Sequence, residues 1–500
     1  MPSDIDTLIA ALHPHVAQGY CGNFLRAGRS LRPIGANGIL HDVVDSFDIL
    51  FGFHPGCDAA AVTIQTAQPG TISLFVCPSP IVPQDFEADV KQWVDQFIAV
   101  HKGSAGEADG NGNLEGKPSP SMRKFILDTY RLCYQSMRQR KMGPEFGIWK
   151  ILSRKIAERT LASKSEPAKL QELPSASELR QLAELAKSFA ETISARERLD
   201  EDEDILRFHQ LCLALYKALS GGWVKELTAY PLHDLILAHL CLPHALSTLL
   251  SESAAQPEVL LALHTSRWSI TVLDPSRGAR RFSSTVTAAH MAERFGKVNV
   301  RSIDWEEAME AYRGVVVRSG DFGKGLEWDA STSLLTSPGA VTAHPETTLI
   351  QHLVGNGGVN LKGDERYVAC SRLPCYASVR YVDAVNKVHV VKPGPTFTIR
   401  TTNPDWCRLD VAEPWILPEG TDEAVVAGLR EAMLWDLDGL LYRWRNDAFR
   451  KREDESDDND DGDGGDHDDN EVDDEEDEDE DEKSDNENGE MDDDTEEPDD

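Results

Sequence analysis

Residues 344–386 read HPETTLIQHLVGNGGVNLKGDERYVACSRLPCYASVRYVDAVN, and the fold class is predicted from them. Apolar side chains recur at helical spacing over 349–354. The Gly-rich segment 355–358 ends that helix, because glycine accepts the left-handed backbone that closes helices. The β-formers at 366–371 predict a strand, and Pro374 suits the first position of a second helix. The stretch therefore predicts the order helix, strand, helix.

Two motifs begin these helices. Residues 344–346 have the pattern H-x-E, and residues 374–378 have the pattern P-C-x-x-C with serine in place of the last cysteine. In zinc deaminases such motifs supply one histidine and two cysteines to Zn²⁺, together with a glutamate that moves protons without touching the metal. Cys375 and Ser378 lie one helical turn apart at a helix N-terminus, where the helix dipole favours a negative thiolate.

The order of H-x-E helix, strand and P-C-x-x-C helix resembles the cytidine-deaminase superfamily. More narrowly, the run from Tyr367 to Asn386 resembles the fungal OTT-type deaminase-like family, and PWILP at 414–418 is similar to the close of that family's domain. The resemblance covers roughly residues 255–420. It implies an α/β three-layer deaminase-like domain in the C-terminal part of the chain. It also implies that the metal ligand positions are His344, Cys375 and Ser378, and that Glu346 is the catalytic acid/base.

The serine changes what this site is expected to do. Zinc binds thiolate and imidazole far better than an alcohol. One interpretation is a deaminase fold with an impaired zinc site and a binding or scaffolding role. A second is an active zinc-dependent hydrolytic deaminase of a nucleobase in nucleic acid or a nucleotide, in which Cys370, His352, Ser378 or water completes the coordination. A third is that His344 and Cys375 are ordinary residues of a packed domain.

The rest of the chain divides by composition and periodicity. We expect a small α/β region at 1–102, a linker at 103–121, a helical accessory region at 122–252, the deaminase-like domain at 255–420, a C-terminal helix at 421–450 and a disordered acidic tail at 451–500. Within these regions the patterns predict a strand pair at 60–77, a helix at 86–101, a hairpin of 259–263 with 269–273, strands at 387–391 and 396–400, and a helix at 423–444.

Charge is concentrated at one end. The formal net charge is −36, and residues 451–500 hold 32 Asp and Glu against 3 Lys and Arg. This segment has almost no apolar side chains to offset the entropy lost on ordering, so we expect it to be disordered. Acidic tails commonly bind basic proteins, so we expect basic proteins as partners. The alternative is that the tail only keeps the protein in solution.

Cysteine usage and hydropathy indicate the compartment. The nine cysteines include no C-x-x-C pair, the N-terminus has no basic leader, and no run approaches the roughly 18 apolar residues of a membrane span. We therefore expect an intracellular protein of the cytoplasm or nucleus, with no membrane partner.

A basic segment at 121–159 carries ten Arg and Lys residues with Tyr130, Tyr134, Phe146 and Trp149 interleaved. Such a segment can bind nucleic acid by phosphate pairing and base stacking. The alternatives are a solvated helix face and a docking site for the acidic tail.

Overall fold

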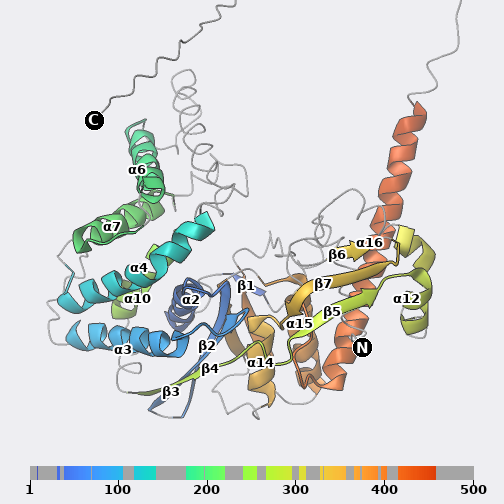
Figure 1. The fold of residues 1–500 in the computed structure, drawn as a ribbon, viewed down its shortest axis with the longest axis horizontal. Coiled ribbons are helices and arrows are strands. Elements are labelled where there is room, and N and C mark those ends of the chain that lie inside the picture. Colours follow the sequence, from blue (N-terminus) through green and yellow to red (C-terminus); the bar gives the residue numbers. More distant parts are fainter. Residues whose placement is uncertain are drawn as a thin grey trace, which may run out of the picture. The chain divides into compact units, whose positions relative to one another are not determined.

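The computed structural model describes Leu8 and residues 31–33, 39–68, 70–104, 118–141, 176–195, 198–219, 240–255, 266–295, 303–310, 327–329, 331–355, 365–371, 374–391, 396–401 and 415–457 (Figure 1). Its internal contacts divide the chain into two units, Met1–Arg445 and Asn446–Asp500. Both hydrophobic cores belong to the first unit.

A mixed sheet is the centre of the first unit (Figure 1). Its six strands lie in the order β1 (Leu31–Pro33), β9 (Thr396–Thr401), β8 (Glu365–Cys370), β2 (Ala59–Gln68), β3 (Thr71–Ser79) and β4 (Arg267–Val272). The pairs β1–β9, β9–β8 and β3–β4 are parallel, and the pairs β8–β2 and β2–β3 are antiparallel. The fold is therefore α/β with a mixed sheet, which confirms the fold class at this level.

The β2–β3 hairpin forms where the sequence predicts a strand pair. Gly70 in the turn has φ 75°, a left-handed conformation that glycine adopts without a clash from Cβ. Val62 then lies opposite Val76 in the antiparallel register.

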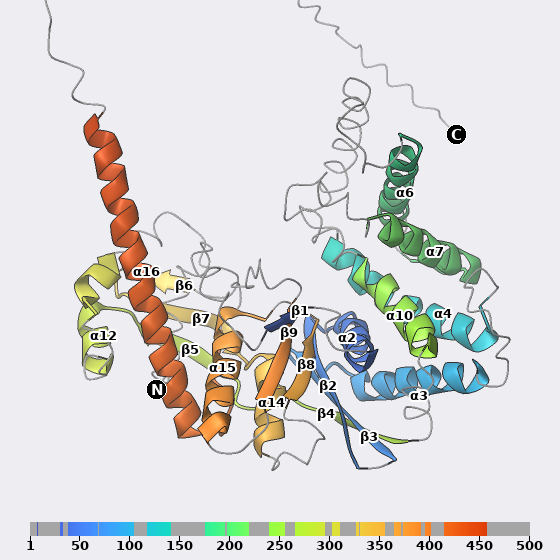
Figure 2. The same cartoon turned by 180° about the vertical axis from the view of Figure 1, so that it is seen from behind.

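The two faces of the sheet belong to different cores, because successive residues of a strand point to opposite faces. Ala60 and Val62 of β2 pack in the first core, whereas Ala61 packs in the second. Helices cover both faces: α2 (Ile39–Gly52) contacts the first, and α14 (Pro345–Gly355) and α15 (Tyr376–Val391) contact the second. Figure 2 shows α14 and α15 side by side along β8 and β9.

The first core continues into a group of helices. These are α3 (Phe86–Ser104), α4 (Pro120–Lys141), α6 (Ala176–Ala195), α7 (Asp202–Leu219) and α10 (Cys241–Ala255). Phe208 lies at their centre, with its ring 5.6 to 5.8 Å from those of Tyr130, Tyr134 and Phe189. The predicted helix at 86–101 and the helical character of 122–252 are confirmed where these residues are described.

The second core is completed by α12 (Ala288–Phe295), by a three-stranded sheet and by α16 (Glu423–Asp457). The small sheet has the order β5 (Arg280–Thr285), β7 (Leu334–Val341), β6 (Glu327–Asp329). Leu429, Met433 and Leu437 form the buried face of α16, as predicted for the helix at 423–444.

The sheet does not follow the predicted region boundaries. Strands β2 and β3 come from the region expected at 1–102, yet they pair with β8 and β4 from the domain expected at 255–420. In the second half of the predicted hairpin 259–273, residues 267–272 form β4, which pairs in parallel with β3. Residues 259–263 lie outside the described part of the chain. The sheet is therefore discontinuous in sequence.

Two local predictions are also wrong. Residues 387–391 end α15 instead of forming a strand, because Val382, Val385 and Val388 share one helix face that packs on the second core. Helix α16 continues to Asp457, past the expected start of the tail at 451, because residues 448–455 are mostly good helix formers. Residues 458–500 lie outside the described part.

Among the described residues, no helix combines the length and the apolar character that crossing a bilayer requires.

Candidate metal centre

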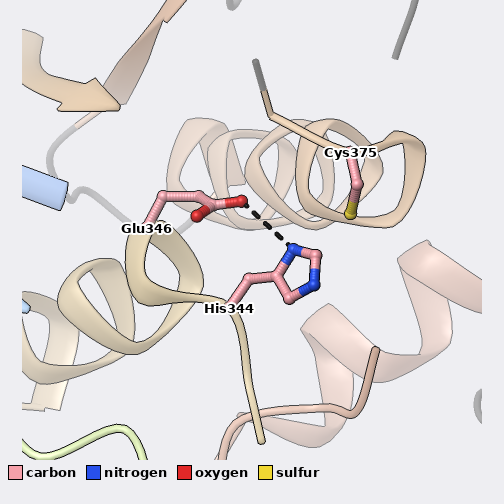
Figure 3. A group of neighbouring side chains, drawn as sticks. All are labelled: His344, Glu346 and Cys375. Atoms are coloured by element: carbon pink, nitrogen blue, oxygen red, sulfur yellow. Dashed lines mark ion pairs between the residues drawn. The ribbon is translucent and has the colours of Figure 1, made fainter. Parts of the chain in front are cut away.

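The four residues singled out from the sequence meet at the starts of two helices. His344 directly precedes α14, and Glu346 lies in its first turn. Cys375 directly precedes α15, and Ser378 lies in its first turn. Figure 3 shows the side chains of His344, Glu346 and Cys375 pointing toward a common space between the two helix ends.

His344 and Cys375 each occupy the position that caps a helix. The carbonyl of His344 accepts the amide of Thr348 at 3.0 Å and the hydroxyl of Thr347 at 2.9 Å. The carbonyl of Cys375 accepts the amide of Val379 at 3.1 Å, and its Sγ accepts the amide of Ser378 at 3.4 Å. Residues at this position have a non-helical backbone, so their side chains project from the helix end. The local capping geometry thus directs both side chains into the site.

The polar atoms of the site lie close together. The possible ligand atoms of His344, Glu346 and Cys375 all lie within 4.8 Å of one another. Nδ1 of His344 is 3.6 Å from Oε1 of Glu346, and it is 3.4 Å from Oγ of Ser378. The same Oγ is 3.2 Å from Sγ of Cys375. Ser378 is thus in contact with both residues that the resemblance assigns as zinc ligands.

These groups are buried as well as close. The exposed fraction is 4% for Glu346, 7% for Cys375 and 0% for Ser378. Burial alone lowers the pKa of His344, but the side chains of Cys375 and Glu346 outweigh this effect and raise the pKa well above its usual value. Burial alone raises the pKa of Glu346, but His344 and the nearby Ser378 side chain lower it overall. His344 and Glu346 thus each favour the charged form of the other.

The donor set fits a zinc ion. Imidazole nitrogen, cysteine sulfur and carboxylate oxygen are the ligand atoms that zinc prefers, at about 2.0 to 2.3 Å. In a tetrahedral arrangement such atoms lie about 3.3 to 3.6 Å apart. The 3.6 Å between Nδ1 and Glu346 and the 3.4 Å between Nδ1 and Ser378 match this spacing. Nε2 of His344 is buried and has no hydrogen-bond partner among the described residues.

The sequence also suggests Cys370 and His352 as residues that complete the coordination. Cys370 is buried at the end of β8, where its Sγ lies 3.9 Å from the carbonyl of Val368. His352 lies at the other end of α14, with its ring 5.7 Å from that of Phe75. Neither belongs to the group formed by His344, Glu346 and Cys375, which is the one group of metal-binding type among the described residues.

The structure adds a residue that the sequence did not indicate. Cys77 of β3 is fully buried, and its pKa is raised first by burial and then by the nearby charge of Glu346. The nearby Thr348 side chain partly offsets these effects on the pKa. Cys77 is remote from the motifs in sequence and lies outside any recognisable pattern, so only the sheet pairing brings it near the site.

A network of polar residues links α15 to α16 directly beside the site. Arg380 donates two hydrogen bonds to Asp436, from Nε at 2.7 Å and from the guanidinium nitrogen NH2 at 2.8 Å. The hydroxyl of Tyr376, the residue after Cys375, donates to the same carboxylate.

Trp415, part of the segment that resembles the close of the deaminase-like domain, is buried in the second core.

The basic segment at 121–159 is described only through Lys141. Its aromatic side chains Tyr130 and Tyr134 are buried in the first core, so they present no stacking surface. Arg123 forms ion pairs with Asp202 and Glu203 of α7, and Arg131 forms one with Asp202. The described part of this segment therefore uses these aromatic and basic groups for packing α4 against α7. Phe146 and Trp149 lie outside the described residues.

No family model, curated protein or solved structure matches this chain.

Proposed function

We propose that this chain is a deaminase-like protein that binds zinc at His344 and Cys375 and has a binding or scaffolding role, because Ser378 impairs the site for catalysis. The observation that carries the proposal is the position of Ser378. Its Oγ lies 3.2 Å from Sγ of Cys375 and 3.4 Å from Nδ1 of His344, where the resemblance expects a second thiolate. The order α14, β8, α15, with both motifs at helix starts, supports the deaminase-like character.

Zinc would be held by His344 and Cys375, and in deaminases it supplies Lewis-acid and water-activating chemistry. A neutral hydroxyl is a poor third ligand, so the site has less charge to hold the metal than one with two thiolates. The scaffolding role is further supported by the acidic segment after α16, which favours basic protein partners.

The test is metal stoichiometry on the full chain after chelation and reloading with zinc. The acidic segment binds divalent ions diffusely, so the matched control is the same chain with His344→Ala and Cys375→Ala. We expect one zinc more per wild-type chain than per control, and tighter binding in Ser378→Cys. Equal zinc content in wild type, Ser378→Cys and control would contradict the zinc site.

The scaffolding role has its own test. Removal of residues 458–500 leaves α16 intact, because that helix ends at Asp457. We expect this truncation to remove basic proteins from affinity pull-downs while zinc content at the site is unchanged. Identical partner sets with and without the segment would contradict its recruiting role.

A second candidate is an active hydrolytic deaminase of a nucleobase in nucleic acid or a nucleotide. The observation that favours it is the position of the Glu346 carboxylate, which is 4% exposed and whose Oε1 lies 3.6 Å from Nδ1 of His344, the residue that the resemblance assigns as a metal ligand. Activity would appear as inosine or uracil formed from adenine or cytosine substrates. Its loss in Glu346→Gln would support this candidate, and unchanged activity would exclude the mechanism.

A further inference from the structure

The buried site offers zinc two oxygen ligands that differ in chemistry. Oε1 of Glu346 lies 3.6 Å from Nδ1 of His344, and Oγ of Ser378 lies 3.4 Å from the same atom. Both distances agree with ligand atoms around a tetrahedral zinc, which lie about 3.3 to 3.6 Å apart. Distance alone therefore leaves both oxygens as possible ligands, and their chemistry decides between them.

We propose that Glu346, and not Ser378, supplies the third protein ligand to zinc, next to His344 and Cys375. This inference rests on the proposed zinc site and goes beyond it, because the resemblance assigns Glu346 to proton transfer and position 378 to the metal. A carboxylate oxygen is an established zinc ligand, whereas a neutral alcohol oxygen is a weak one.

Charge supports the same assignment. A zinc ion bound by the Cys375 thiolate and the Glu346 carboxylate has no net charge, and a neutral group is far less costly to bury than a charged one. Glu346 is 4% exposed, so direct contact with the metal compensates a carboxylate that water reaches poorly. A bound Ser378 hydroxyl would add no compensating charge.

Ser378 has another use in this arrangement. Its Oγ lies 3.2 Å from Sγ of Cys375 and 3.4 Å from Nδ1 of His344, within hydrogen-bonding distance of both. Hydrogen bonds of this kind orient the groups that bind a metal. Ser378 is then a positioning residue, and Glu346, bound to zinc, is not available to move protons. The zinc site in this form holds the starts of α14 and α15 together, as a scaffolding protein requires.

The experiment compares Glu346→Gln with Ser378→Ala in the full chain, using Co²⁺ as a probe of the zinc site. Bound Co²⁺ shows a thiolate-to-cobalt absorption band, which separates the site from diffuse binding by carboxylates. Cys375→Ser is the control, because it removes the thiolate and should remove the band. Competition with Zn²⁺ then gives the zinc affinity, and circular dichroism checks that each variant is folded.

We expect Glu346→Gln to weaken zinc by at least about 100-fold, since the loss of a ligand should exceed the 10 to 100-fold cost of an orienting group. Ser378→Ala should weaken zinc by about 10-fold or less. Glu346→Asp provides a second variant that keeps the charge but is one methylene shorter, and it should also weaken binding. Zinc binding that survives Glu346→Gln, or that Ser378→Ala abolishes, would overturn the ligand assignment while leaving the zinc site itself in place. If the wild-type chain showed no cobalt band, that result would contradict the proposed zinc site itself.

Discussion

The ion pair between Arg380 and Asp436 gives a quantitative test of how α16 is fixed to the helix that begins at the site. Asp436→Ala removes the acceptor of two guanidinium hydrogen bonds, at 2.7 and 2.8 Å, and of the Tyr376 hydroxyl. The two side chains of the ion pair are 15% and 7% exposed, so water replaces the lost carboxylate poorly.

Removal of one member of a buried ion pair costs about 3 to 5 kcal/mol, because the other charge stays buried without its partner. Asp383 lies 3.5 Å from Arg380, so in Asp436→Ala the positive charge of Arg380 still has one carboxylate close to it. We therefore expect Asp436→Ala to lower the free energy of unfolding by about 3 kcal/mol, at the lower end of this range. Arg380→Met should cost less, because burial raises the pKa of Asp436 and the unpaired carboxyl can take up a proton.

The double variant Arg380→Met with Asp436→Leu replaces the pair by apolar side chains, and such replacements are often neutral or stabilising. Urea denaturation of the full chain, followed by far-ultraviolet circular dichroism, measures wild type, Arg380→Met, Asp436→Leu and the double variant, which together form the mutant cycle. The single variants should lose stability, and the double variant should recover most of it, with a coupling energy above about 1 kcal/mol. A single-variant cost below about 1 kcal/mol, or purely additive effects, would refute a buried and ordered pair.

Two further predictions concern other parts of the first unit. Burial lowers the pKa of His209 to about 4, below its value of about 6.5 in an unfolded chain, so its contribution to stability is full above pH 6.5 and is lost as pH falls toward 4. His209→Asn, which keeps an acceptor for the Tyr130 hydroxyl at 3.2 Å, should remove up to about 3 kcal/mol of this pH dependence in urea midpoints, and an unchanged pH profile would count against the assignment. In Gly52→Ala the new Cβ would lie 2.5 Å from Oγ of Ser371, so we expect a loss of about 1 to 3 kcal/mol in thermal or urea unfolding. Gly339→Ala meets no atom within 4 Å and is the control, and equal stability of the two variants would contradict the close approach.

Elements with strong local signals were predictable from the sequence. The hairpin β2–β3 follows from β-formers on both sides of Gly70, and α14, β8 and α15 follow from the glycines, the strand pattern and Pro374. The capping positions of His344 and Cys375 are also local, because each lies directly before its helix.

Elements that depend on remote partners were not predictable. Strand β4 pairs in parallel with β3, and nothing in the sequence of 267–272 specifies a partner nearly two hundred residues earlier. Residues 387–391 are rich in valine and fit a strand locally. Packing keeps them helical, and Asn386 fixes this end of α15 to β9 through two hydrogen bonds with the backbone of Phe397, at 2.8 and 2.7 Å.

The same limit applies to the site. The two short motifs name the residues of the site. The distances between these residues could not be predicted, because they depend on how β8, which lies between the two helices in sequence, pairs with β2 and β9. Cys77 joins the surroundings of Glu346 only through the position of β3. The role proposed for Glu346 also depends on distance, since its Oε1 lies 3.6 Å from Nδ1 of His344, a separation that agrees with two ligands of one metal ion.

The pairing of β2 with β8 has a consequence for synthesis on the ribosome. Ala60 and Ser371, which are hydrogen-bonded at the end of this pair, are 311 residues apart. At about 5 to 20 residues per second, the β2 edge waits about 15 to 60 s before its partner strand is made. During that interval its free N–H and C=O groups can pair with strands of other chains. The nascent protein therefore needs its β2 edge shielded while the helices from α3 to α10 are being made and folded.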